Sequence, residues 1–220
     1  MNPIQWRHNL KALMATLALC GCQAAASDRA QEALARQAEE RRAAQERSEE
    51  LTHRGQSAYD KAQHEEAKAK LTEAVATDPS NARAWMTLGL VEYAREDYYK
   101  SAEAFYQASR LTPLRYEPRF NLGSVLEAAG KHSKAIHEYE AALALAPDQL
   151  EVMENLIRCY IHVGEKPDLT RQLIQTAIKR EDRPEWRAWL QKQASALATA
   201  ITSAPATLPS MTQPAPDHGR

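Results

Sequence analysis

The chain has 220 residues, enough for one ordinary domain with appendages. Its formal net charge of −1 disfavours a nucleic-acid-binding protein, because such proteins usually carry a strongly basic face. With only 7 glycines and 2 phenylalanines, and with abundant Ala, Glu, Leu, Arg and Gln, the composition favours an all-α fold over a sheet.

The segment 1–21 has the pattern of a secretory signal. Arg7, His8 and Lys11 supply a basic start, and residues 10–19 form a short apolar run. That run is too short to stay in a bilayer as a spanning helix, and no interior stretch is long and apolar enough. We therefore expect residues 1–21 to be removed. An ordinary signal peptide without lipidation, or a cytoplasmic protein with a misplaced start codon, is the alternative.

The end of this segment resembles a bacterial lipobox, at which lipoproteins are cleaved and acylated. It reads Leu19-Cys20-Gly21-Cys22, with Leu19 three residues before Cys22 and the small Gly21 directly before it. The resemblance implies that Cys22 becomes the amino-terminal residue and carries the acyl chains of a lipid anchor. Each buried methylene contributes about 0.8 kcal/mol, so two or three such chains would hold the protein at a membrane.

A charged, alanine-rich segment follows at residues 28–47, after a short tether at 22–27. Glu32 and Arg36 form a helix-supporting pair four residues apart. Because the apolar residues do not sustain a heptad, we predict a solvated helix that runs into the next segment, rather than a dimerisation helix. About 20 helical residues span about 30 Å and would hold the following segment away from a membrane.

One pattern then recurs along the chain at a fixed period. Glycines and prolines both keep a constant step: Gly55, Gly89 and Gly123, and Pro79, Pro113 and Pro147. Small and large residues recur between them at the same step: Ala67, Ser101 and Ala135, and Leu71, Phe105 and Tyr139. The spacing predicts pairs of helices that approach closely at the glycine and the small residue, with the large residue filling the space between pairs. Each proline lacks a backbone donor and is expected to stop the second helix.

This period and these residue types resemble the tetratricopeptide repeat (TPR), whose helix pairs stack into an α-α superhelix. The resemblance begins at about Ser48. The repeats are expected at residues 48–81, 82–115, 116–149 and, in degenerate form, 150–181. In the last of these, Ile157 stands in place of the glycine, and terminal repeats are commonly atypical because one side has no neighbour. We therefore expect an all-α TPR solenoid.

A further helix is predicted after the repeats, at residues 182–200. Asp182 and Pro184 indicate its start, and Trp186, Trp189, Leu190 and Leu197 follow at helical spacing. We expect it to cap the open end of the stack, whereas a membrane-seeking helix would need a more basic polar face. Residues 201–220 contain four prolines mixed with Ser and Thr, and we predict a disordered tail.

No motif predicts an enzyme. The chain lacks a Gly-rich phosphate loop, a Gly-x-Ser-x-Gly elbow and an HExxH helix. No two histidines of the body lie three or four residues apart, as a metal site on one helix face would need. Cys159 is left without a disulfide partner, and we predict that its thiol is buried and unreactive. We therefore expect no catalysis, no cofactor, no metal and no small-molecule substrate.

The TPR resemblance also implies where a partner would bind, because the first helices of such repeats line a concave groove. Mapped onto this sequence, the groove residues that we select are Tyr59, Met86, Leu90, Tyr93, Phe120, Asn121, Ser124, Asn155 and Arg158. Some relatives clamp a terminal carboxylate with cations and an asparagine at such places. Here Met86, Leu90 and Glu151 stand there, so we reject that mode.

The selected residues are apolar and aromatic in the middle of the groove, which suits an extended or helical segment of another protein. The alternative is that several of them pack inside the repeats or against the charged helix. We expect an interaction scaffold of the bacterial envelope, with a protein client and a lipid anchor. A structural spacer or a self-associating lipoprotein without a client is the rival.

The resemblance to lipoproteins also indicates the membrane at which the protein is expected. Gln23, next to the acylated cysteine, is not the aspartate that retains such proteins at the inner membrane of enteric bacteria. We therefore expect an outer-membrane protein that faces the periplasm. The resemblance also suggests a role in the assembly of pili or secretion complexes.

Overall fold

The structure is a computed structural model that describes the backbone of residues 3–203 and the side chains of residues 31–199. All regular structure in this part of the chain is helical, which confirms the predicted all-α class. The helices are α1 (Pro3–Asp60), α2 (His64–Thr77), α3 (Ala82–Ala94), α4 (Tyr98–Leu111), α5 (Glu117–Ala128), α6 (His132–Leu145), α7 (Leu150–Val163), α8 (Pro167–Arg180) and α9 (Pro184–Ser203). They fall into two compact units, which we call unit 1 (residues 1–111) and unit 2 (residues 112–220).

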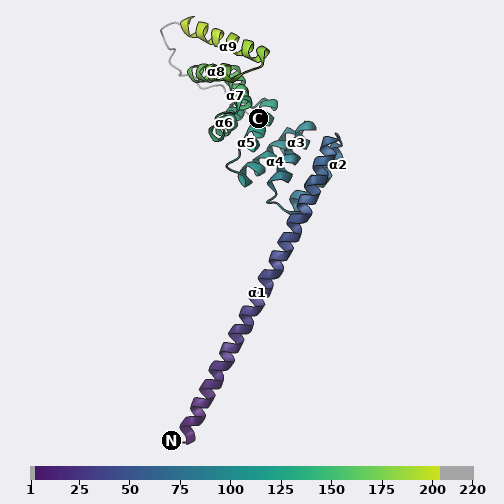
Figure 1. Cartoon of the computed structure of the whole chain (residues 1–220), viewed down its shortest axis with the longest axis vertical. Coiled ribbons are helices and arrows are strands. Elements are labelled where there is room, and N and C mark those ends of the chain that lie inside the picture. Colours follow the sequence, from purple (N-terminus) through teal and green to yellow (C-terminus); the bar gives the residue numbers. More distant parts are fainter. Residues whose placement is uncertain (1–2, 204–220) are drawn as a thin grey trace, which may run out of the picture. The chain divides into compact units, whose positions relative to one another are not determined.

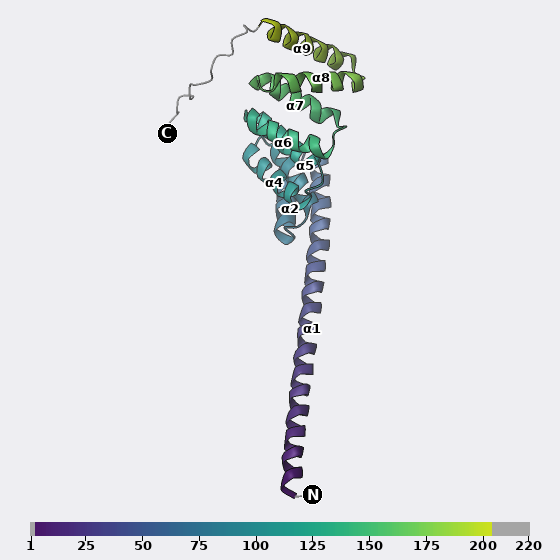
Figure 2. The same cartoon turned by 90° about the vertical axis from the view of Figure 1, so that its left-hand side faces the viewer.

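Unit 1 begins with a single long helix. Helix α1 has 58 residues, and at 1.5 Å per residue it is about 87 Å long. Residues 22–27, which we assigned to a tether, are helical, so the charged helix has no separate start at residue 28. Figures 1 and 2 show that only the last part of α1 lies beside α2 and α3, while the rest extends away from them.

The charged segment behaves as a solvated helix that continues into the repeats. Nearly all side chains of residues 31–47 are exposed, and burial begins at Ser48 and Leu51. Alanine, glutamate, glutamine and arginine, all good helix formers, dominate the exposed part. The last turns of α1 therefore serve as the first helix of the first pair, with α2 as the second.

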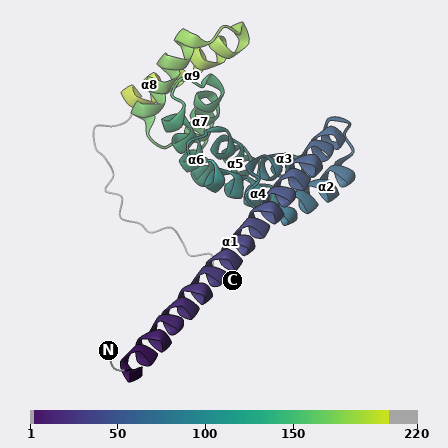
Figure 3. The same ribbon diagram turned by 60° about the horizontal axis from the view of Figure 1, so that its bottom comes forward.

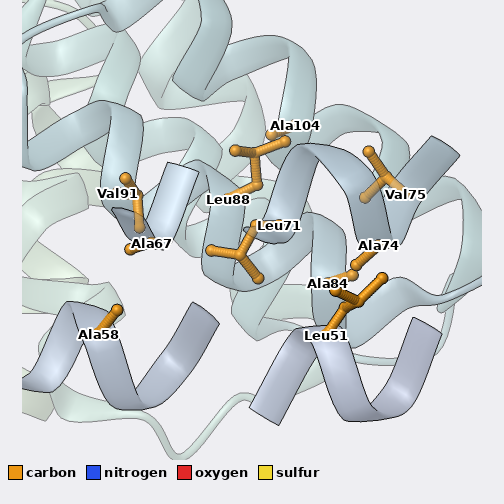
Figure 4. Packing of buried hydrophobic residues seen from close by; sticks show 10 residues of the cluster. All are labelled: Leu51, Ala58, Ala67, Leu71, Ala74, Val75, Ala84, Leu88, Val91 and Ala104. Carbon is orange, nitrogen blue, oxygen red and sulfur yellow. The ribbon is translucent and has the colours of Figure 1, made fainter. Parts of the chain in front are cut away.

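The core of unit 1 joins α1, α2, α3 and α4. Leu71 of α2 and Val91 of α3 are fully buried, and Leu51 of α1 and Leu88 of α3 are nearly so. Figure 4 shows these side chains between the helices, together with the alanines of the same cluster. Figure 3 shows α1 running alongside α2 and α3 from another side.

The repeated glycines are explained by direct contacts. A Cβ atom at Gly89 would lie 2.6 Å from Cε1 of Phe105, and one at Gly55 would lie 2.5 Å from Cγ of Leu71. The hydroxyl of Ser101 donates a hydrogen bond of 2.8 Å to the carbonyl of Gly89. The close approach at the glycine and small residue is therefore confirmed. The large residue, however, packs against the glycine of its own helix pair, where we expected it between pairs.

The corners inside the pairs repeat at the same step as the glycines and prolines. Ala62, Glu96, Gly130 and Gly164 all have positive φ, at 58°, 60°, 71° and 77°. Only glycine adopts this conformation without a steric penalty. The prolines act as predicted as well, because α2, α4 and α6 each end two residues before Pro79, Pro113 and Pro147.

Unit 2 contains α5 to α9. Figure 2 shows α6, α7, α8 and α9 each lying on the next, in chain order. Tyr139 of α6 and Tyr160 of α7 are the largest buried side chains. Helix α9 covers the last pair with Leu190, which is fully buried against Ile174 of α8. It extends to Ser203, three residues into the segment that we assigned to the tail, and residues 204–220 lie outside the described part.

Candidate functional site

Helix α3 is apolar on two sides. Ala84, Leu88 and Val91 pack in the core of unit 1. Met86 and Leu90 are half-buried, and Tyr93 is 41% exposed. These three positions follow the spacing i, i+4 and i+7, so they share one side of the helix. We call them the α3 face. An apolar side that the core does not use is a candidate for contact with another molecule.

The remaining predicted groove residue of unit 1 faces inward. Tyr59 of α1 is half-buried and packs against the core. Its ring centroid lies 5.9 Å from that of His64. For Tyr59, the alternative of packing inside the repeat therefore describes the structure better. Tyr93 is different, since it is 41% exposed, and the ring centroid of the half-buried Tyr98 lies 5.9 Å from its own.

A buried polar network sets the position of α3 against α1. Asn81 caps α3, because its Oδ1 accepts a hydrogen bond of 3.0 Å from the backbone N–H of Ala84. Its Nδ2 donates to the hydroxyls of Ser48 at 2.9 Å and Thr52 at 3.1 Å. Both hydroxyl residues are buried. Three hydrogen bonds of Asn81 therefore hold the start of the helix that carries the α3 face.

A buried carboxylate holds the other end of α3. Glu92 is 2% exposed and lies 3.0 Å from Nζ of Lys68 and 2.6 Å from a guanidinium nitrogen of Arg95. Arg95 also contacts Glu65 of α2 at 2.8 Å. Hydrogen bonds to Glu92 and then to Glu65 raise the pKa of Arg95. The α3 face thus belongs to a rigid element that is anchored at both ends.

In unit 2, polar groove residues gather around the hydroxyl of Tyr139. This oxygen lies 2.8 Å from Oε2 of Glu127 and 3.2 Å from Oγ of Ser124. Nδ2 of Asn155 donates to it over 3.5 Å. Burial, more than any neighbour, raises the pKa of Tyr139, so the phenol stays protonated. The structure therefore brings Ser124 and Asn155 to the same hydroxyl.

The other groove residues of unit 2 lie around this network. Arg158 of α7 donates to Oε1 of Glu127 of α5 at 2.9 Å. Phe120 is half-buried, and its ring centroid lies 5.9 Å from that of Tyr139. Asn121 is half-buried on α5. The polar side chains of this surface are therefore paired with one another, and Phe120 belongs largely to the core.

Two pockets of unit 2 adjoin Arg158. The smaller, of about 270 Å³, has mainly apolar walls and is lined by Arg158, Glu185, Trp186 and Trp189. We call it the tryptophan pocket. The larger, of about 290 Å³, is lined by Glu127, His132, Arg158, Ile161, His162 and Trp189. The tryptophan rings meet edge to face at 5.5 Å, and the guanidinium of Arg183 lies 5.2 Å from the ring centroid of Trp186.

Sequence reasoning missed the tryptophan pocket. We assigned Trp186, Trp189 and Leu190 together to capping, yet Leu190 is fully buried while both indoles are only half-buried. The signal was present, because two tryptophans three residues apart share a helix side and tryptophan is enriched in binding surfaces.

Two histidines of different helices lie close together, and their spacing along the sequence could not reveal this. His132 of α6 and His162 of α7 have ring centroids 3.9 Å apart. Nδ1 of His132 is buried without a hydrogen-bond partner. Among the described residues, no three His, Cys, Asp or Glu side chains are grouped as a metal ion would require.

Cys159 has the environment that we predicted. It is 1% exposed, and burial raises the pKa of its thiol to about 12. The thiolate needed for nucleophilic chemistry is therefore not formed at neutral pH. The side chain of Cys22, the predicted lipidation site, lies outside the described side chains. None of the helices in the described part combines the length and the apolar character that a membrane span requires.

A carboxyl pair joins α7 to the segment that leads into α9. Glu154 and Glu181 are both buried, and Arg183 lies 2.5 Å from Oε1 of the first and 2.7 Å from Oε2 of the second. Burial, and then the neighbouring Glu181, raises the pKa of Glu154 to about 7. Hydrogen bonds from Arg183 hold the pKa of Glu181 well below its usual range. The pKa values of the two carboxyls are thus pushed apart beside one guanidinium.

Comparisons with known proteins agree with this architecture. Two family models described as tetratricopeptide repeat match residues 53–116 and residues 116–149. Superkiller complex protein 3 of Mus musculus is 27% identical over 103 residues, which make up 47% of this chain. The match spans only 7% of that protein's length.

Solved structures show the same fold. YrrB, described as a TPR protein with an unusual peptide-binding site, aligns over 67% of this chain and 74% of its own, with 19% identity and a TM-score of 0.59. The pilF protein of Pseudomonas aeruginosa aligns over 73% of this chain and 71% of its own, with 19% identity and a TM-score of 0.57. At these identities the likeness shows the fold alone.

The family assignment rests on two independent observations. The helix pairs repeat at a constant step with their glycine contacts, and the family models match consecutive stretches of these pairs. Repeats of this kind generally act as non-catalytic scaffolds whose surfaces bind other proteins. The predicted all-α TPR solenoid is confirmed, and the chain is a tetratricopeptide-repeat protein, a scaffold for protein–protein interaction.

Proposed function

We propose that the protein is a membrane-anchored adaptor of the bacterial envelope that binds a segment of a client protein on the α3 face. One observation carries the proposal: Met86, Leu90 and Tyr93 form an apolar side of α3 that the core of unit 1 does not use. A helix whose sides are both apolar gains stability only if each side is covered. The core covers one side, and a client would cover the other.

The chemistry of the α3 face suits a polypeptide client. Methionine adapts its shape to irregular partners, and tyrosine combines a large apolar surface with a polar hydroxyl. The helix is rigidly held, through Asn81 at its start and Glu92 near its end. A preorganised surface loses little side-chain entropy on binding, which favours affinity. The peptide-binding site described for YrrB shows that this fold can hold such a ligand.

The long helix α1 supports the anchoring part of the proposal. If Cys22 is acylated, the helical stretch from Cys22 to Arg47 places the repeats about 39 Å from the membrane. A client that extends from a membrane complex would then meet the α3 face at that distance. We place the protein at the outer membrane, facing the periplasm, on the lipobox and on Gln23. A role in pilus or secretion-complex assembly rests on the resemblance to lipoproteins of those systems.

Crosslinking tests the adaptor directly. A photoreactive residue replaces Tyr93 in the full-length chain, in the bacterium that produces it, and mass spectrometry identifies the product. The matched control carries the same residue at Tyr99 of α4, which is 80% exposed but lies outside the α3 face. One defined client from Tyr93 and none from Tyr99 is expected. Self-adducts alone, or identical products from both sites, would favour the spacer or the self-associating protein.

A double substitution measures the contribution of the face. Leu90→Ser with Tyr93→Ser should weaken the complex with that client at least tenfold, because central interface residues commonly contribute about 2 kcal/mol. Tyr99→Ser with Tyr106→Ser removes a larger exposed surface from α4 and should still leave the affinity unchanged. Circular dichroism of both variants should match the parent protein. Equal affinity in the two double variants would refute binding at the α3 face.

A further inference from the structure

The tryptophan pocket is not needed to close the helix stack. Leu190, Ile174 and Ala177 are fully buried and hold α9 against α8. Trp186 and Trp189 remain half-buried, with part of each ring on the wall of the pocket. Exposed indole surface in a pocket of about 270 Å³ is the kind of site that a small apolar group fills.

The chain itself carries a segment with the right chemistry. After α9 come residues 204–220, with Pro205, Pro209, Pro214 and Pro216. Proline-rich segments bind grooves that are lined by aromatic rings, because the restricted proline backbone loses little entropy on binding. Two prolines separated by a single residue, as at 214 and 216, present two rings close together to a pair of indoles.

The distances permit this contact within one molecule. Trp189 lies 14 residues before the end of α9 at Ser203, which is about 21 Å along the helix. A proline-rich segment extends by about 3.1 Å per residue, so about seven residues lead back from Ser203 to the pocket. Pro214 and Pro216 lie beyond this limit and are within reach, whereas Pro205 lies in the stretch that must span the gap.

We propose that the segment around Pro214 and Pro216 folds back and occupies the tryptophan pocket of its own chain. Tethering gives the segment a millimolar effective concentration at the pocket, so even a weak contact is populated. Any partner that used this pocket would first have to displace the segment. The contact lies in unit 2, and it is independent of the client site proposed on α3 in unit 1.

Fluorine NMR of the full-length chain labelled with 5-fluorotryptophan tests the proposal. The four tryptophans give four resonances, which single Trp→Phe variants assign. Pro214→Ser with Pro216→Ser should displace the resonances of Trp186 and Trp189 and leave that of Trp85 in place. Pro205→Ser with Pro209→Ser is the matched control and should leave all of them in place. A synthetic peptide of residues 204–220, added to the first variant, should restore the parental positions.

Three results would overturn the proposal. Identical resonances in the parent and in a chain lacking residues 204–220 would show that the pocket is empty of the segment. Equal displacement by the two double variants would show that Pro214 and Pro216 are not the docked residues. Resonances of Trp186 and Trp189 that move on tenfold dilution of the truncated chain would identify a second copy as the occupant.

Discussion

Units 1 and 2 use the same framework but present different surfaces. Leu90 of α3 corresponds, one and two repeats further along the chain, to Ser124 of α5 and Arg158 of α7, and Tyr93 corresponds to Glu127. On α3 these two positions are apolar and partly exposed. In unit 2 they are polar and largely paired with one another. The repeats thus keep a common buried framework while the side chains at their accessible positions differ.

The buried framework is almost the same in both units. Phe105 packs on Gly89 in unit 1, and Tyr139 packs on Gly123 in unit 2, each at 2.6 Å from the position that a Cβ atom would take. The two rings differ by one hydroxyl, and that hydroxyl is where the polar surface of unit 2 begins. Substitutions at matched positions therefore test whether the two units share one framework and how their surfaces differ.

The largest effects are expected from removing the two rings. Phe105→Ala and Tyr139→Ala should each lower the free energy of unfolding by roughly 3–5 kcal/mol, since both side chains are fully buried. Chemical denaturation followed by circular dichroism measures this loss. A much smaller loss in one unit would show that the framework is not shared equally.

Exchanging this hydroxyl between the two rings tests how the surfaces of the two units differ. Tyr139→Phe removes the hydrogen bonds of the Tyr139 hydroxyl with Glu127 and Ser124. Arg158 and the carbonyl of Phe120 remain as their partners. Phe105→Tyr places a hydroxyl beside the apolar Leu90 and Tyr93. Each exchange should cost about 1–2 kcal/mol, because the first loses hydrogen bonds and the second buries a hydroxyl among apolar side chains. If Phe105→Tyr left the free energy of unfolding unchanged, unit 1 would be able to accommodate the hydroxyl that Tyr139 carries in unit 2.

A smaller effect that depends on pH is expected at the carboxyl pair, which belongs to unit 2. Glu181→Gln should cost about 2 kcal/mol, because hydrogen bonds to charged groups are strong and solvent moderates the loss at the half-exposed Arg183. Glu154→Gln should cost less than about 1 kcal/mol at pH 6, because its neutral amide replaces a carboxyl that is already protonated.

The sign of the pH dependence follows from the raised pKa of Glu154. Its stabilising contribution is complete below the ordinary pKa of 4.5 and is lost as the pH rises through about 7. Between pH 6 and pH 8 the parent protein should therefore lose stability relative to Glu154→Gln. Denaturation midpoints of both proteins at the two pH values measure this difference. A constant difference would show that the pKa of Glu154 is not raised in the folded protein.

The smallest effects are expected at the helix corners. Glu96 in unit 1 and Gly130 in unit 2 occupy matched positions with positive φ. Glu96→Gly should stabilise the protein by about 0.5–1 kcal/mol, and Gly130→Ala should destabilise it by about 1 kcal/mol. No atom lies within 4 Å of the added Cβ at Gly130, so only the backbone contributes. Melting temperatures should move in opposite directions by about 2–4 °C. Melting-temperature shifts of the same sign would contradict the prediction that the two corners share one backbone conformation.

Some features of the candidate site could be predicted from the sequence, whereas others became evident only in the structure. The groove positions could be chosen from the repeat register, and the structure places Met86, Leu90 and Tyr93 on one accessible side of α3. The register could not show that Tyr59 packs inward, because that depends on the neighbouring corner at His64. Nor could it show the tryptophan pocket, since Arg158 and Trp189 come from different helices.

The sequence by itself determined the period, the helix pairs, the proline stops and the close approach of the paired helices at the glycine. These features follow from residues that lie within one repeat of one another, and local contacts of that kind leave a repeating pattern. Only the tertiary structure decided which side chains of different helices meet, such as His132 with His162 and Arg158 with Glu127. Such pairs leave no periodic signal, because each occurs once and depends on how the helices pack.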